Sequence, residues 1–193
     1  MTQYSFDFSA REANNNADPL FVQRWSPRAF TKTTIDPVVM ERIINAARWS
    51  PSCFNAQPWQ IYTSSDATFS EFLDILVEGN QDWAKDTAVL GFMVANLNFE
   101  HNGKPNAWAE FDCGSAWMSL TLQARLEGLH THGMGGFDAE RAAKYLDIDS
   151  EKQKVVMAFS IGQVVDPATL DSQAKSNETP NSRKNLNAIW HVK

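Results

Sequence analysis

The chain of 193 residues has the length of one compact domain, and with 43% hydrophobic and 21% charged residues it can form a core, which excludes a disordered chain. Its formal net charge of −6 disfavours a nucleic-acid binder, which needs a basic surface. The sequence has no apolar run of the roughly 20 residues that span a bilayer and no apolar signal-peptide core, so we expect no membrane partner and a cytoplasmic location.

Aspartate–proline pairs predict two helix starts in the first third of the chain. Asp18 precedes Pro19 and Asp36 precedes Pro37, and an aspartate cap with proline at the first helical position is a strong start signal. The second helix has apolar residues at helical spacing and must end before the next proline. The polar residues 11–19 predict a loop before and around the first start.

Apolar runs and helical spacing predict the remaining elements. Gly79 is placed just past a helix end, and Gly128 ends a long helix. Strands and helices that alternate in this way favour one layered domain of the α+β or α/β class over residues 1–193. We expect strands over 58–63, 87–95 and 155–163, and helices over 69–76, 107–127 and 139–146, the last capped by Asp138.

The first candidate binding segment is RWSPRAF, from Arg24 to Phe30. Arg24 and Arg28 flank Ser26, and the planar guanidinium group donates two parallel charge-assisted hydrogen bonds that suit a phosphate. The serine hydroxyl adds a short donor. The competing interpretation is a solvated basic turn before a helix.

The second candidate segment, WSPSCFNAQPW over residues 49–59, lies between a predicted helix and a predicted strand. Two prolines brace it, and Ser52, Asn55 and Gln57 lie between them. Amide and hydroxyl groups on a rigid loop can hydrogen-bond the edge of a heteroaromatic ring. An ordinary helix-to-strand loop is equally consistent with the pattern.

Two further segments complete the candidate site. The glycines of GMGGFD, residues 133–138, permit positive φ and close backbone approach to a ligand ahead of a helix start, although the spacing is not that of the dinucleotide motif GxGxxG. Arg183 and Lys184 form a basic pair in the polar tail, where they either contact a phosphate or are solvated.

Taken together and in this order, these segments resemble the flavin-dependent nitroreductase family, and GNQDW (79–83) and VVMAFSIGQ (155–163) add to the resemblance. The resemblance runs from about Asp18 to the C-terminus. It implies an α+β sandwich with a central mixed sheet flanked by helices, in an intertwined homodimer that binds FMN non-covalently at its interface. Residues 1–17 would be an N-terminal extension, and residues 166–193 would wrap the partner subunit.

The resemblance also implies which residues bind FMN. Arg24 and Ser26 match phosphate and ribityl contacts, and Arg28 matches the cation near the flavin pyrimidine ring. Asn80 matches a contact to the edge of that ring. The further residues implied in cofactor binding are Trp25, then Pro51, Ser52, Cys53, Asn55 and Gln57 of the second segment (Ser52 and Asn55 from the partner subunit), Met134, Gly135 and Gly136 beside the ring, and Arg183 on the phosphate.

The implied activity is hydride transfer from NAD(P)H through FMN to a small electrophilic acceptor such as a nitroaromatic or a quinone, in ping-pong fashion. It needs no metal and no protein base or nucleophile, and Arg28 acts by stabilising negative charge on the flavin. The chain departs from some members of the family at Trp83 and Asn181, where those members have lysines. Lys85 is close to the first of these positions in sequence.

Several alternatives stay open. The acceptor could be an enone, an aldehyde, a halogenated compound or free flavin, because one fold supports several chemistries. The chain could also be a flavin-binding protein without turnover. A metal hydrolase at His130 and His132, with His101, and a cysteine enzyme at Cys53 are weaker alternatives, since neither has partners at recognisable spacing. The sequence does not distinguish NADH from NADPH.

Overall fold

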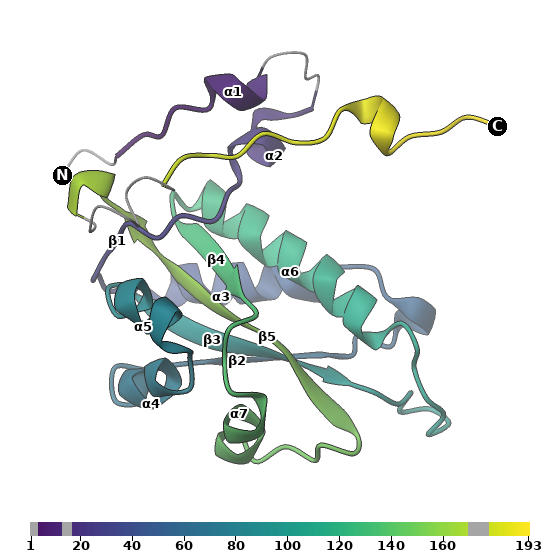
Figure 1. The fold of residues 1–193 in the computed structure, drawn as a ribbon. Helices are drawn as coiled ribbons and strands as arrows, with labels where there is room; N and C mark the ends of the chain where they lie inside the picture. The colour runs from purple at the N-terminus through teal and green to yellow at the C-terminus, as the bar shows by residue number, and fades with distance from the viewer. Residues whose placement is uncertain (1–3, 13–16, 170–177) are drawn as a thin grey trace.

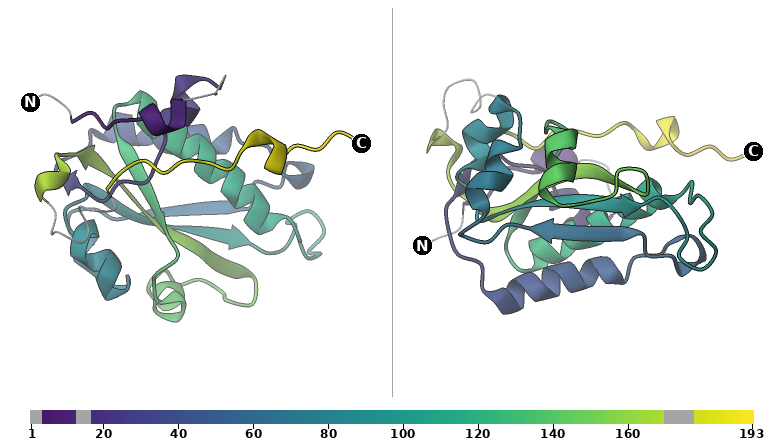
Figure 2. Two further views of the ribbon diagram at one scale, coloured as in Figure 1. Left: turned by 45° about the horizontal axis from the view of Figure 1, so that its top comes forward. Right: turned by 90° about the horizontal axis from the view of Figure 1, so that it is seen from below.

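The computed structural model describes residues 4–12, 17–169 and 178–193. These residues form one central sheet with helices on both of its faces (Figure 1). Helices α3 and α6 cover one face of the sheet, and α4, α5 and α7 cover the other (Figures 1 and 2). The elements are α1 (Ser9–Glu12), α2 (Pro19–Gln23), β1 (Phe30–Thr31), α3 (Pro37–Arg48), β2 (Trp59–Thr63), α4 (Phe69–Asp74), α5 (Glu78–Ala84), β3 (Val89–Asn96), α6 (Ala109–Leu126), β4 (His130–Met134), α7 (Ala139–Tyr145) and β5 (Gln153–Val164), with 3₁₀ turns at Cys53–Asn55, Pro167–Thr169 and Leu186–Ala188.

The predicted aspartate caps are confirmed at three helices. The Asp18 carboxylate accepts from the second residue of α2 and Asp36 from the second residue of α3, each at 2.8 Å. Asp138 accepts from the backbone N–H of Arg141 in α7 at 3.0 Å. Each cap satisfies one of the donors that a helix start leaves without an internal partner.

The sheet has the order β1-β5-β3-β2, with β4 paired to β5. All four strand pairings within the described residues are antiparallel, which corrects the expected mixed sheet. The sheet has no parallel pair among these strands because β5 separates β3 from β4. Residues 158–161 of β5 pair with both β3 and β4, so β5 lies between these two strands. β3 and β4 run in the same direction, as the crossover through α6 requires, but they are not neighbours.

Other elements differ from the predictions. β1, β4, α1 and α5 were not expected, and Gly79 lies inside α5 rather than past a helix end, because α4 already ends at Asp74. Gly128 does end α6, with a φ of 77° that favours glycine. Residues 13–16 of the predicted loop lie outside the described part of the chain. No helix that the structure describes is both long and apolar enough to cross a membrane.

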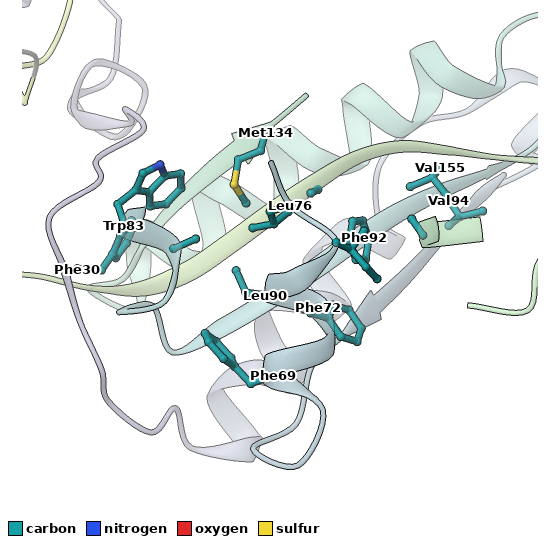
Figure 3. Packing of buried hydrophobic residues seen from close by; sticks show 14 of the residues in the cluster. Phe30, Phe69, Phe72, Leu76, Trp83, Leu90, Phe92, Val94, Met134 and Val155 are labelled. Atoms are coloured by element: carbon teal, nitrogen blue, oxygen red, sulfur yellow. The ribbon is translucent and has the colours of Figure 1, made fainter. Parts of the chain in front are cut away.

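Two hydrophobic clusters hold the helices to the sheet. Alternate residues of β3 contribute to opposite faces, as the pleat requires: Phe92 belongs to the cluster under α4, α5 and α7, and Met93 to the cluster under α3 and α6. Trp83 fills the end of the first cluster, where its ring stacks on Phe30 with a centroid distance of 6.1 Å. Figure 3 shows this cluster, whose labelled members are Phe30, Phe69, Phe72, Leu76, Trp83, Leu90, Phe92, Val94, Met134 and Val155.

We expect Gly91→Ala to lower the free energy of unfolding by about 1–3 kcal/mol, the usual effect of overpacking a core. A Cβ at Gly91 would lie 2.2 Å from the ring of Phe159, which is fully buried and cannot withdraw. The matched control is Gly79→Ala in α5, where no described atom lies within 4 Å of the added carbon. Urea unfolding should show a loss for Gly91→Ala and a small gain for the control. Equal stability of the two variants would contradict this packing.

Candidate functional site

Three arginines from distant parts of the sequence gather at one edge of the molecule. Arg11 lies in α1, Arg24 directly follows α2, and Arg183 belongs to the tail that runs beside both helices (Figure 1). Burial, followed by the charges of Arg183 and Arg24, lowers the pKa of Arg11 to about 10. The pKa of Arg24 is lowered first by burial and then by Arg183. The three guanidinium groups therefore repel one another in the folded chain.

This cluster fits a phosphate group. None of its three arginines forms an ion pair with a carboxylate of the described residues. Arg24 Nη1 donates to Ser26 Oγ at 3.4 Å, which places the predicted serine beside the predicted arginine. An anion bound here would relieve the repulsion and accept charge-assisted hydrogen bonds. Sequence reasoning missed Arg11, which the polar composition of residues 11–19 had assigned to a loop.

Arg11 also joins three segments of backbone. Its Nη1 donates to the carbonyls of Val22 and Arg24 at 3.1 and 2.9 Å. Its Nε donates to the carbonyl of Asn181 in the tail at 2.5 Å. Because the carbonyls at the end of α2 lack helical partners, the cation satisfies them and neutralises the negative end of the helix.

A buried carboxylate holds the other end of the RWSPRAF segment. Glu178 Oε1 accepts from the backbone N–H groups of Arg28 and Ala29 at 2.5 and 2.8 Å. The Glu178 side chain is 3% exposed, and burial raises its pKa, although the two amides and the charge of Arg28 act in the opposite direction. Sequence reasoning missed this residue because its partners are about 150 positions away.

His132 of β4 contacts the backbone of the same segment. Its Nδ1 lies 2.8 Å from the carbonyl of Pro27 and must donate, since a carbonyl only accepts. The ring packs on Trp83 with a centroid distance of 4.5 Å. Burial is the largest cause that lowers the pKa of His132 to about 4, so the ring is neutral near pH 7. Trp83 therefore lies in the core, whereas Lys85 is exposed.

His130 and His132 have other partners than a metal ion among the described residues. His130 Nε2 accepts from Arg125 at 3.2 Å, and burial followed by that positive charge lowers the pKa of His130 to about 3. A cation in this place disfavours a bound metal ion. Within the described ranges no group of three potential ligands comes together, and His101 is exposed beside Phe99.

The glycine segment meets α5. The Gly136 carbonyl accepts from the backbone of Val77 at 3.1 Å and from Asn80 Nδ2 at 2.9 Å. A Cβ at Gly136 would lie 2.7 Å from Asn80 Nδ2, so glycine is required for this contact. Gly135 has no described atom within 4 Å of a Cβ position, which leaves room for a ligand. Neither Gly135 nor Gly136 uses the positive φ that glycine permits.

Two of the predicted cofactor residues have buried side chains. Trp25 is 3% exposed and packs edge-to-face on Phe6, and Met134 is 4% exposed within the same cluster. These side chains belong to the core, so only the backbone of either residue remains for a ligand.

The loop between α3 and β2 has a strained backbone. Phe54, Asn55 and Gln57 have φ values of 53°, 55° and 46°, in the left-handed region that favours glycine. Ser52 Oγ accepts from the Gln57 backbone N–H at 3.0 Å. Strain of this kind persists where surrounding contacts enforce it, and it clusters at functional sites.

Asp112 of α6 anchors this loop. It is 4% exposed, and its Oδ2 accepts from the backbone N–H of Cys53 at 3.0 Å. Cys53 is a partly buried free thiol, and Pro51, Asn55 and Gln57 are exposed around it. Sequence reasoning had assigned Asp112 no role.

One copy of the chain does not bring the loop and the arginine cluster together. The loop contacts Asp112, near the start of α6, whereas the segment around Trp25 packs on Phe6, which packs on His130 beside Arg125, near the end of α6. Asp112 and Arg125 are 13 positions apart, or roughly 20 Å along a helix. Figure 1 shows α2, which Arg24 directly follows, at the end of α6 that leads into β4.

Comparisons with known proteins agree on one family. The model of the nitroreductase family matches residues 21–82 and 63–163. The chain is 27% identical to "Putative NAD(P)H nitroreductase YdgI" of Bacillus subtilis strain 168, over 66% of this chain and 78% of the relative, and 27% identical to YodC of the same strain, which has the same description, over 79% and 89%. It superposes on a solved oxidoreductase containing FMN with a TM-score of 0.89 and 36% identity, over 94% of this chain and 93% of that one. The chain belongs to the nitroreductase family.

Proposed function

We propose that this protein is an FMN-dependent oxidoreductase that uses NAD(P)H to reduce a small electrophilic acceptor, such as a nitroaromatic or a quinone. The observation that carries the proposal is the convergence of Arg11, Arg24 and Arg183, which lack carboxylate partners among the described residues. The names of the B. subtilis relatives and of the FMN-containing oxidoreductase support the same activity.

The candidate residues offer groups that suit the separate parts of FMN. Arg24 and Arg183 would hold the phosphate, and Ser26 would contact the ribityl chain. The open space at Gly135 would accept the ring, and Asn80 would hydrogen-bond its edge. Bound FMN supplies the hydride chemistry, while the protein binds, orients and tunes the cofactor. Arg28 would tune it, since a fixed positive charge stabilises the negative charge of a reduced flavin.

We propose further that the working unit is a homodimer. The strained loop and the arginine cluster lie at opposite ends of α6, so both can reach one flavin only if they come from different copies. Large apolar side chains are exposed near both ends of α6 and along the tail, which favours burial against a second copy. These side chains are Trp108, Phe111 and Leu126, with Leu186, Ile189, Trp190 and Val192 in the tail.

Spectroscopy of the purified protein tests the proposed function. We expect a dimer in light-scattering chromatography and visible flavin absorbance that NADH or NADPH bleaches without oxygen. A nitroaromatic or a quinone should then restore the absorbance, and Arg28→Ala should be reduced more slowly. Protein that stays colourless and monomeric after addition of FMN would contradict the proposal. Bound flavin that neither nicotinamide bleaches would indicate a binding protein without turnover.

A further inference from the structure

The tail of this protein is fixed to the N-terminal region at two points close to the arginine cluster. Glu178 contacts the RWSPRAF segment, and three residues later the backbone of Asn181 contacts Arg11. Arg183 follows two residues after that. The two anchors therefore hold the backbone that leads into Arg183, and the second uses the same Arg11 side chain that donates to the Arg24 carbonyl.

The first anchor is directional. A single oxygen of Glu178 accepts from two consecutive backbone amides, those of Arg28 and Ala29, which a side chain can do from only one direction. No partner for the second oxygen occurs in the described ranges. A buried carboxylate with a raised pKa is unfavourable unless its hydrogen bonds compensate. The role that explains this residue is the attachment of the tail.

The second anchor opposes a repulsion. Arg183 carries a charge of the same sign as Arg11 and Arg24, and that charge lowers the pKa of both. Arg183 is exposed, and its own Nη1 donates to the backbone carbonyls of Asn181 and Ser182 within the tail. Electrostatics alone would move the tail outward. The hydrogen bond from Arg11 Nε to the Asn181 carbonyl acts against this movement.

We infer that Glu178 and Arg11 are positioning residues, and that together they clasp the tail so that Arg183 and Arg24 form a preorganised phosphate subsite. This inference rests on the proposed function, since it concerns how the chain holds the phosphate of FMN. A preformed site binds more tightly because the ordering of its groups is not left to the moment of binding.

The comparison of FMN with riboflavin tests this inference, because riboflavin has the same ring and ribityl chain but no phosphate. We expect Glu178→Ala to weaken FMN binding by about tenfold, which is the effect of losing one charge-assisted hydrogen bond between Arg183 and the phosphate. Riboflavin binding should be unchanged. Flavin fluorescence titration of the flavin-free dimer measures both affinities. Glu178→Gln is the matched control, since its amide oxygen can still accept from both backbone amides, and it should keep the preference of the wild type for FMN.

Arg11→Lys provides a second variant should Glu178→Ala fail to fold. It keeps the positive charge of the cluster but lacks the guanidinium Nε–H that donates to the Asn181 carbonyl, and it should also lose the preference for FMN. An unchanged preference in Glu178→Ala or Arg11→Lys would overturn the clasp while the proposed function stands. A parallel loss of riboflavin and FMN binding would also overturn it, because the role would then be general stability. Failure of the wild type itself to bind FMN would instead refute the proposed function.

Discussion

Replacing Arg24 with methionine is expected to weaken FMN binding by about 10- to 100-fold, because a charge-assisted hydrogen bond to the phosphate, worth about 1.5–3 kcal/mol, is lost. The same variant should leave the flavin-free protein at least as stable as the wild type. Burial and the neighbouring Arg183 lower the pKa of Arg24, which means that its charge is unfavourable in the folded chain. Loss of the ligand and gain of stability would distinguish a binding residue from a structural one.

Arg48→Met is the matched control for this prediction. Arg48 is an exposed arginine at the end of α3 whose Nη1 donates to Asn45, and it is not one of the candidate FMN-binding residues. Its replacement should leave FMN affinity unchanged. Titration at two salt concentrations adds a second measure, since loss of a phosphate contact reduces the dependence of affinity on salt. An Arg24→Met variant with the affinity and salt dependence of the wild type would show that Arg24 does not contact the phosphate.

We expect the flavin-free protein to lose stability as the pH falls below about 6.5, with His132 as one of the responsible groups. Burial lowers the pKa of His132 from 6.5 to about 4, so in this interval the unfolded chain binds a proton that the folded chain excludes. The stabilising contribution is present above pH 6.5 and is lost as the pH falls through about 4. A difference of this size corresponds to about 3 kcal/mol. His130, whose pKa is lowered to about 3, adds to the effect.

Urea unfolding of His132→Asn at about pH 5 and about pH 7 measures this contribution. Asparagine keeps an N–H donor for the Pro27 carbonyl but does not titrate, so the decrease in stability should be shallower by about 1.4 kcal/mol per pH unit. His101→Asn is the control, because it makes the same replacement at an exposed histidine. Parallel curves for His132→Asn and the wild type would contradict a neutral, buried His132.

The sequence predicted those parts of the fold that local signals specify. Asp18, Asp36 and Asp138 cap helices as expected, because cap and helix lie within four residues of each other. β4 was missed because its residues, His130 to Met134, are not an apolar run, although four of the five are buried. β4 is buried because it pairs with β5 and contacts α6. These are tertiary effects that a local sequence pattern does not contain.

The candidate site was predictable only in part for the same reason. Arg24, Ser26 and Asn80 were identified from motifs, and the structure places Arg24 beside Ser26. Glu178 and Asp112 were not identified, since each contacts a backbone amide that is 59 or more positions away, and nothing in the adjacent sequence marks such a contact. The candidate binding positions follow motifs, whereas the residues that contact them depend on the completed fold.

The 18-residue length of α6 limits how the sequence of this protein can evolve. The helix is a spacer that fixes the interval between the strained loop and the end of the molecule where the arginines gather. One inserted residue would shift one end by about 1.5 Å and rotate it by about 100° relative to the other. Substitutions on its surface can accumulate, but insertions and deletions within it should be eliminated, while surface turns such as residues 100–104 can accept them.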